Sequence, residues 1–245
     1  MDIEKEREFF DKFEAEHGDY DVLDERAYRR LLDLFKEMIE PRPGERCADL
    51  GCGTGAFTRR LHEFGLDLTG FDISPLQVGR ANREAKGTER YEVGDIRATG
   101  APAGSFDIIV YSGVLHHCDT RTSRIEVLTE GARLLRPGGR IYAYDPSVQS
   151  PSMFLYRDPR SPIHSTKGKT ANEVLLHRRE LEAELRESGF DRVAIRGVSG
   201  ITFRYVDSPV ARLFLGAYNA YEHLLRLSPF ENRLGTFLVT TAKRR

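Results

Sequence analysis

Five short apolar runs alternate with amphipathic stretches between residues 46 and 145, and this alternation restricts the fold more than any other feature. The apolar runs cover 46–51, 67–72, 89–94, 106–112 and 140–145. Stretches that repeat apolar residues at helical spacing cover 55–64, 74–86 and 121–135. Strands joined by helices form βαβ units, in which the strands lie parallel. The sequence therefore predicts an α/β fold built on a doubly wound, mostly parallel sheet.

The segments that flank this alternation are predicted as additions to the sheet. A helical cap is expected over residues 1–40, where two charged stretches repeat apolar residues at helical spacing. After Asp145 the order is insertion, helix, strand, insertion and strand, at 147–176, 178–188, 191–197, 207–230 and 235–242. Because no linker divides two hydrophobic cores, we expect one domain over 1–245, with its ligand-binding core at 44–145.

The net charge and the cysteines argue against several classes of protein. Thirty-seven Lys and Arg residues against 38 Asp and Glu residues give a net charge of −1, so no global positive field attracts nucleic acid. Cys47, Cys52 and Cys118 form no Cys-x-x-Cys pair, which argues against a disulfide framework or a thiolate zinc site. The sequence contains no uncharged apolar stretch of about 18 residues. We expect a cytoplasmic protein without a membrane segment.

A glycine-rich segment, Asp-Leu-Gly-Cys-Gly-Thr-Gly at residues 49–55, lies where the first predicted strand meets the first predicted helix. Open α/β sheets bind nucleotide-like ligands at this place, because glycines let a ligand approach the backbone closely. Gly51, Gly53 and Ala56 also satisfy the dinucleotide-binding pattern, so the segment alone does not identify the ligand.

Three aspartates at the ends of predicted strands narrow the choice of ligand. Asp49 places a carboxylate beside the glycine segment, which suits an ammonium group better than a pyrophosphate. Asp72 closes the second strand, where a carboxylate can accept two hydrogen bonds from a ribose diol. Asp95 closes the third strand and is placed to accept a hydrogen bond from the exocyclic amine of a base.

Together with later motifs, these residues resemble a known family. The glycine segment is followed in order by Gly-Phe-Asp-Ile-Ser, Val-Gly-Asp-Ile, Val-Leu-His-His and Leu-Arg-Pro-Gly-Gly, all within residues 46–145. This order resembles the class I S-adenosylmethionine-dependent methyltransferases of the small-molecule type. The resemblance implies a seven-stranded, Rossmann-like sheet with its last strand antiparallel. It also implies S-adenosylmethionine as methyl donor, S-adenosylhomocysteine as product, and no metal.

The resemblance assigns roles to single residues. The glycine segment would hold the methionine tail of the donor, Asp72 the ribose and Asp95 the adenine N6, with Ile73 and Ile96 flanking the adenine. The expected donor-contacting residues are Asp49, Gly51, Cys52, Gly53, Gly55, Asp72, Ile73, Asp95, Ile96 and Ser112.

Two histidines after the fourth predicted strand are the candidates for proton removal. His116 and His117 lie at the carboxyl edge of the sheet, which borders the donor. Methyl transfer to a hydroxyl or an ammonium requires loss of a proton, and histidine titrates near neutrality. His116 is the first choice and His117 the second, and Asp145 is expected to orient one imidazole. A structural role, with the ring packed and hydrogen-bonded, remains open for each histidine.

The acceptor is expected to be a small molecule that is methylated on O, N or C. The pattern Asn/Asp-Pro-Pro-aromatic, which resembles amino-methylating nucleic-acid enzymes, is absent after the fourth strand. The N-terminal helices and the two insertions should form the acceptor pocket, because loops over strand ends determine specificity. Residues 147–172 are predicted to be a lid or a disordered loop.

The composition of the two insertions suggests further properties. The first insertion carries four basic residues, Arg157, Arg160, Lys167 and Lys169, which suggest an anionic acceptor. An apolar helix face in 207–230 is expected to pack on the core, to line the pocket or to form a homodimer contact.

Two other functions remain open from the sequence. A nicotinamide-dependent oxidoreductase could use the same glycine segment, although Asp95 and the histidines would then have no assigned role. A protein that binds the donor without turnover would retain every donor motif.

Overall fold

Seven strands form one mixed sheet in the computed structural model, which describes residues 3–17, 23–161, 170, 172–204 and 209–245. The strands are β1 Arg46–Leu50, β2 Asp67–Asp72, β3 Arg90–Val93, β4 Phe106–Ser112, β5 Leu135–Pro146, β6 Phe190–Val198 and β7 Phe237–Arg244. Their order across the sheet is β3-β2-β1-β4-β5-β7-β6. β7 pairs antiparallel with β5 and β6, and the pairs among the first five strands are parallel. The predicted fold class, including the antiparallel last strand, is confirmed.

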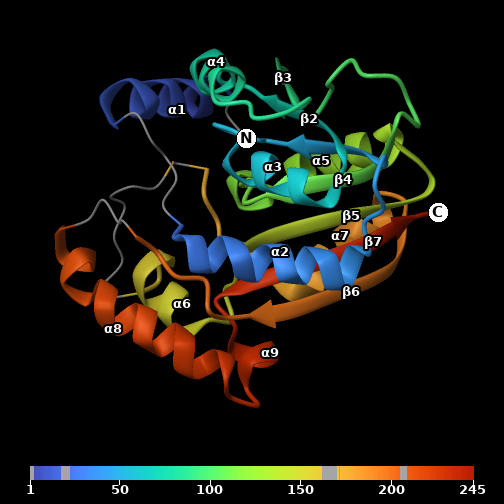
Figure 1. Cartoon of the computed structure of the whole chain (residues 1–245). Coiled ribbons are helices and arrows are strands. Elements are labelled where there is room, and N and C mark those ends of the chain that lie inside the picture. Colours follow the sequence, from blue (N-terminus) through green and yellow to red (C-terminus); the bar gives the residue numbers. More distant parts are fainter. Residues whose placement is uncertain (1–2, 18–22, 162–169, 171, 205–208) are drawn as a thin grey trace.

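Helices cover both faces of this sheet (Figure 1). α2 (Glu25–Ile39) and α3 (Ala56–Leu61) pack on one face, and α5 (Arg121–Leu134) and α7 (Arg178–Glu187) pack on the other. α1 (Ile3–His17) contacts α4 (Pro75–Arg83), which packs against the edge strand β3. The remaining described helices are α6 Pro151–Arg157, α8 Pro209–Arg226 and α9 Glu231–Leu234, with 3-10 turns η1 His62–Phe64 and η2 Leu115–His117. None of the described helices is long and apolar enough to cross a membrane.

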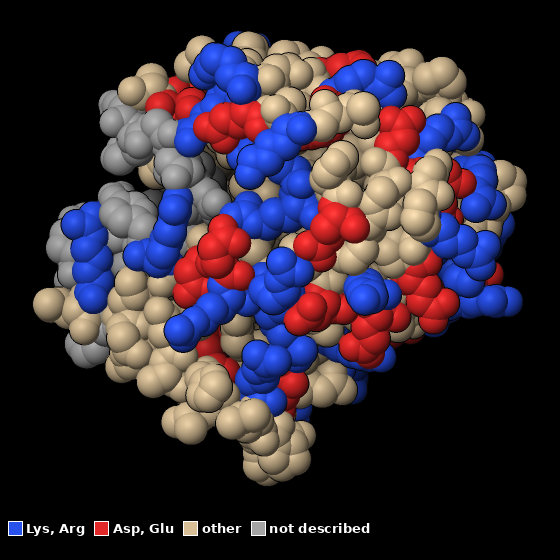
Figure 2. All heavy atoms as spheres, viewed as in Figure 1, with Lys and Arg blue, Asp and Glu red and all other residues tan. Residues whose placement is uncertain are grey.

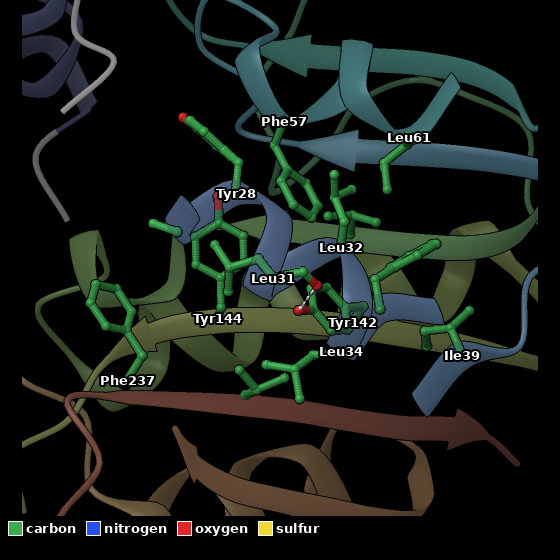
Figure 3. Packing of buried hydrophobic residues seen from close by; sticks show 14 of the residues in the cluster. Tyr28, Leu31, Leu32, Leu34, Ile39, Phe57, Leu61, Tyr142, Tyr144 and Phe237 are labelled. Atoms are coloured by element: carbon green, nitrogen blue, oxygen red, sulfur yellow. Dashed lines mark hydrogen bonds between the residues drawn. The ribbon is translucent and has the colours of Figure 1, made fainter. Parts of the chain in front are cut away.

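The amphipathic pattern of α2 explains its position on the sheet. Asp24 caps the helix by accepting a hydrogen bond from the N–H of Ala27 at 2.9 Å. The inward face packs against α3 and β5, as the rings of Phe57 and Tyr142 show in Figure 3. The hydroxyl of Tyr142 donates to the carbonyl of Leu31 at 2.8 Å, so this buried polar group has a partner. Of the two helices predicted in the cap, α2 therefore covers one face of the sheet, whereas α1 packs against α4.

Several boundaries differ from the expected ones. β5 begins at Leu135 rather than at residue 140, because Leu135 pairs with Phe106 before an irregularity that places extra residues in β5. The helix expected over 55–64 ends at Leu61 and continues as the separate turn η1. The insertion at 147–172 contains α6, whereas residues 162–169 and 171, with Lys167 and Lys169, lie outside the described residues.

The apolar face predicted in the second insertion is only partly buried. Of its residues on α8, Leu225 is 7% exposed as expected, whereas Leu213 and Leu224 are 81% and 68% exposed, so the expectation that these two pack on the core is wrong. The side chains of Val210 and Phe214 lie outside the described residues. Instead the carboxylate of Glu222, which is buried, accepts a hydrogen bond from the N–H of Gly200 at 3.0 Å and anchors the helix. The homodimer contact remains a prediction.

Candidate active site

The glycine segment turns tightly between β1 and α3, and two of its glycines are required by their surroundings. Gly51 and Gly55 have φ angles of 82° and 76°, in the left-handed region. A Cβ on Gly51 would lie 2.5 Å from the side chain of Val114, and one on Gly55 would lie 2.7 Å from the ring of Tyr91. The bare backbone therefore forms the floor of a site at the carboxyl ends of the strands.

Two buried aspartates fix this floor. Asp72 at the end of β2 accepts hydrogen bonds from the N–H groups of Gly53 at 2.8 Å and Ser74 at 2.9 Å. Asp49 at β1 accepts from the hydroxyls of Thr58 at 2.7 Å and Ser112 at 2.9 Å. Burial raises the pKa of Asp72, and it raises the pKa of Asp49 to about 6.

A cavity of about 1000 Å³, including space open to solvent, lies over the glycine segment. All of the predicted donor-contacting residues line the cavity except Asp49 and Gly55. Asp49 has no exposed surface and lies behind the glycine segment. The hydroxyl of Ser112, which lines the cavity, donates a hydrogen bond to its carboxylate and connects Asp49 to the cavity. The residues present fit a donor with an extended tail, a ribose and a base, because glycines, acids and apolar side chains all line the same cavity.

The base end of this cavity combines apolar walls with one acid. Ile73 and Ile96 line it, as the resemblance implies. Asp95 also lines it, and its carboxylate binds the guanidinium of Arg97 at 2.7 Å. This ion pair fixes the orientation of the Asp95 carboxylate. The carboxylate oxygens have further lone pairs that can accept a hydrogen bond from an exocyclic amine.

The two candidate histidines have different environments on η2. Nδ1 of His116 lies 2.9 Å from Oδ1 of Asp145, which also accepts from the backbone N–H of His116 at 3.0 Å. Burial lowers the pKa of His116 to about 3 and raises that of Asp145 to about 8. Nδ1 of His117 lies 2.6 Å from Oε1 of Glu6 on α1. Burial opposes protonation of His117, but the Glu6 carboxylate raises its pKa above the usual value.

A second cavity, of about 920 Å³ with its open space included, adjoins the first one. The two share five lining residues, Tyr28, Ser112, Gly113, His117 and Tyr144. His116 lines only the second cavity, together with residues of the first insertion. Asp145 lines neither and is 1% exposed, so it acts on the site only through His116.

The predicted basic lid contributes less free charge than its sequence suggests. Arg157 lines the second cavity, and its guanidinium lies 3.8 Å from the carboxylate of Glu173. Arg160 binds Asp158 at 2.7 Å and does not line the cavity. Among the described residues, the argument for an anionic acceptor therefore weakens.

Several residues at the site were not identified from the sequence. Ile3, Glu6 and Phe10 of α1 line the donor cavity, although α1 was assigned to the acceptor pocket. Tyr28 and Tyr144 line both cavities. Their apolar spacing indicates helix and strand but not which ring faces a ligand, so no local signal distinguishes them from core residues.

The comparisons with known proteins agree with this geometry. A family model described as "Methyltransferase domain" matches residues 48–143. The 27-O-demethylrifamycin SV methyltransferase of Amycolatopsis mediterranei (strain S699) is 32% identical over 219 residues, which are 87% of this chain and 78% of that protein. This chain belongs to the class I S-adenosylmethionine-dependent methyltransferases.

Two further comparisons differ in how much of this methyltransferase they cover. "Probable tRNA methyltransferase 9B" of Homo sapiens is 34% identical over 125 residues, which are 50% of this chain and 25% of that protein. A solved S-adenosylmethionine-dependent methyltransferase from Thermotoga maritima, titled a possible histamine N-methyltransferase, has a TM-score of 0.68 at 17% identity and covers 97% of this chain and 99% of that one. At that identity the likeness shows the fold alone.

Family membership decides between the cofactors that the sequence left open. S-adenosylmethionine is the methyl donor, and the oxidoreductase alternative, which left Asp95 and the histidines without a role, is not supported. The first cavity, which the glycine segment, Asp72 and Asp95 line, remains the predicted site for this donor.

Proposed function

We propose that this methyltransferase transfers the methyl group to a hydroxyl oxygen of a small organic molecule bound in the second cavity. The observation that carries the proposal is the shared wall of the two cavities, formed in part by Ser112, Gly113 and His117. A donor and an acceptor that meet at this wall react without leaving the protein, which converts a bimolecular step into an intramolecular one.

The comparisons support an oxygen of a small molecule over a nucleic acid. The rifamycin-type relative, whose name specifies an O-methyl group, matches 87% of this chain. The tRNA-methyltransferase relative matches only 50%. The surface supports the same choice, since Figure 2 shows Lys and Arg intermixed with Asp and Glu across the visible face. The three cysteines are free and buried, which fits a reducing compartment such as the cytoplasm.

In this proposal each part of the site has a separate task. The donor supplies a methyl group activated on a sulfonium sulfur. The glycine floor and Asp72 hold the donor, and Tyr28 and Tyr144 exclude water from the shared wall. Asp145 orients the imidazole of His116, which burial keeps neutral at neutral pH by lowering its pKa. The free Nε2 of this neutral ring accepts the proton of the acceptor hydroxyl during methyl transfer.

Turnover with labelled S-adenosylmethionine and a panel of hydroxylated small molecules tests the proposal. We expect His116→Ala to lower turnover by about 10²- to 10⁴-fold while S-adenosylhomocysteine binding stays nearly unchanged. His223→Ala, which removes an exposed histidine on α8, is the matched control. Methylation of tRNA but of no small molecule would contradict the acceptor class. Donor binding with no methylated product at all would favour binding without turnover.

A further inference from the structure

One cluster at the second cavity holds more metal-ligating groups than a proton acceptor requires. His116, His117 and Glu173 each offer one ligand atom, and these atoms lie within 4.8 Å of one another. All three residues line the second cavity. Glu173 lies far from the histidines in the sequence, so no motif connects them, and the sequence predicts no metal site.

Both imidazoles are held by a carboxylate through the same ring nitrogen. Nδ1 of His116 lies 2.9 Å from Asp145, and Nδ1 of His117 lies 2.6 Å from Glu6. The ring nitrogen left on each histidine is Nε2. Metal-binding histidines characteristically donate their other N–H to a carboxylate, which fixes the tautomer and the orientation of the ring. A single base needs one such pair, whereas this site has two.

The third group is fixed to the same place by backbone contacts. The N–H of Thr170 donates to Oε1 of Glu173 at 3.0 Å. The N–H of Val174 donates to the carbonyl of His116 at 2.8 Å, which joins this segment directly to η2. The guanidinium of Arg157 lies beside this cluster, with Nη1 at 3.8 Å from Oε2 of Glu173. Its positive charge disfavours the binding of a cation.

We infer that His116, His117 and Glu173 form a binding site for a divalent transition-metal ion. Two imidazole nitrogens and one carboxylate oxygen suit Zn²⁺, Fe²⁺, Co²⁺ or Ni²⁺ better than Mg²⁺ or Ca²⁺, which prefer oxygen ligands. Three protein ligands leave an open coordination position at the acceptor cavity, as in catalytic zinc sites.

The consequence for catalysis rests on the proposed function, whereas metal binding itself does not. The lone pair of Nε2 on His116 cannot ligate an ion and accept a proton at the same time. If an ion were bound, it would supply a Lewis acid at the second cavity and would lower the pKa of an acceptor hydroxyl there. Base catalysis by His116 and metal occupancy are therefore mutually exclusive states of one site.

Calorimetric titration of the full chain with Zn²⁺, repeated with Co²⁺ and followed by its visible absorption, tests the inference. We expect one ion per chain. His116→Ala and Glu173→Gln should each weaken binding by at least about 10- to 100-fold. His223→Ala should leave binding unchanged, because this histidine lies on α8 away from the cluster. Arg157→Gln should tighten binding several-fold, since it removes the opposing positive charge.

Either of two results would overturn the inference. One is equal Zn²⁺ affinity in the wild type, His116→Ala and Glu173→Gln; the other is Mg²⁺ binding as tight as Zn²⁺ binding. S-adenosylhomocysteine titrations of the same samples show that each variant is folded, because neither substituted residue lines the donor cavity. Failure of the proposed function would appear as absent methyl transfer and would leave the metal titration unaffected.

Discussion

Replacing Asp49 by Asn should remove most of the acid sensitivity of S-adenosylmethionine binding. Asp49 is fully buried behind the glycine floor, and burial raises its pKa to about 6. The hydroxyl of Ser112, which donates to the Asp49 carboxylate, lines the donor cavity. S-adenosylmethionine has two positive groups, an ammonium and a sulfonium, and one negative carboxylate, so its net charge is positive. An ionised Asp49 therefore favours its binding.

The expected size of the effect follows from this pKa. A carboxyl group with a pKa of about 6 is nearly all ionised at pH 7.5 and about one-tenth ionised at pH 5. If the ionised form binds the donor, affinity falls about 10-fold between these values, which is about 1.4 kcal/mol. The bound cation lowers the pKa of Asp49, so binding releases a proton and tightens as the pH rises through 6. Asn carries no charge at either pH and lacks this contribution.

Calorimetry of S-adenosylmethionine binding at several pH values from 5 to 7.5 measures the effect. In buffers of different ionisation enthalpy, the same titrations count the protons released. Asp95→Asn is the control, and it should weaken binding while keeping the wild-type pH dependence. The Asp49→Asn variant retains Asp72 and His117, so its difference from the wild type isolates Asp49. An identical pH dependence in both proteins would refute the reasoning.

Two further predictions concern the floor of the site and the far face of the sheet. Gly55→Ala should cost at least about 1–2 kcal/mol of stability and weaken S-adenosylhomocysteine binding, because its φ of 76° is left-handed and its Cβ would meet the Tyr91 ring. The control is Gly216→Ala on α8, where nothing lies within 4 Å of the added Cβ, and it should stabilise the protein by up to about 1 kcal/mol. Equal shifts in melting temperature for Gly55→Ala and Gly216→Ala would contradict this explanation. Arg124→Ala leaves the carboxylate of Glu184, bound at 2.8 and 2.9 Å, buried without its partner. Urea unfolding should show a loss of about 3–5 kcal/mol, and a loss below about 1 kcal/mol would count against this account.

Local patterns were sufficient for the strands and for most of the helices, but not for α6 and α9. Alternating apolar runs gave the strands, because side chains on a buried parallel strand are apolar on both faces. Helical spacing and proline or glycine boundaries gave the helices. The right-handed crossover rule leaves few topologies for the parallel strands, and the family resemblance supplied the seven strands and the antiparallel last one. The expectation for Leu213 and Leu224 of α8 failed because the hydrogen bond from Gly200 to Glu222 holds another side of the helix inward.

The grouping of most predicted donor-contacting residues around one cavity was predictable, because these residues follow strand ends that meet at one edge of the sheet. Gly51, Gly53, Asp72 and Asp95 fall within short motifs, and parallel strands bring such motifs together whatever the loops do. The role of Asp49 was less accessible. Its type and position were evident in the sequence, but its burial behind the floor depends on how α3 packs.

The sequence by itself therefore determined the sheet, the glycine floor and the positions of the two histidines along the chain. Only the tertiary structure decided which carboxylate meets which imidazole, pairing Asp145 with His116 and Glu6 with His117. It also decided that Glu173 joins them at the second cavity. The physical reason is that periodicity records which face of an element is buried. Contacts between side chains from α1, η2 and the first insertion depend on how these distant segments close over the sheet.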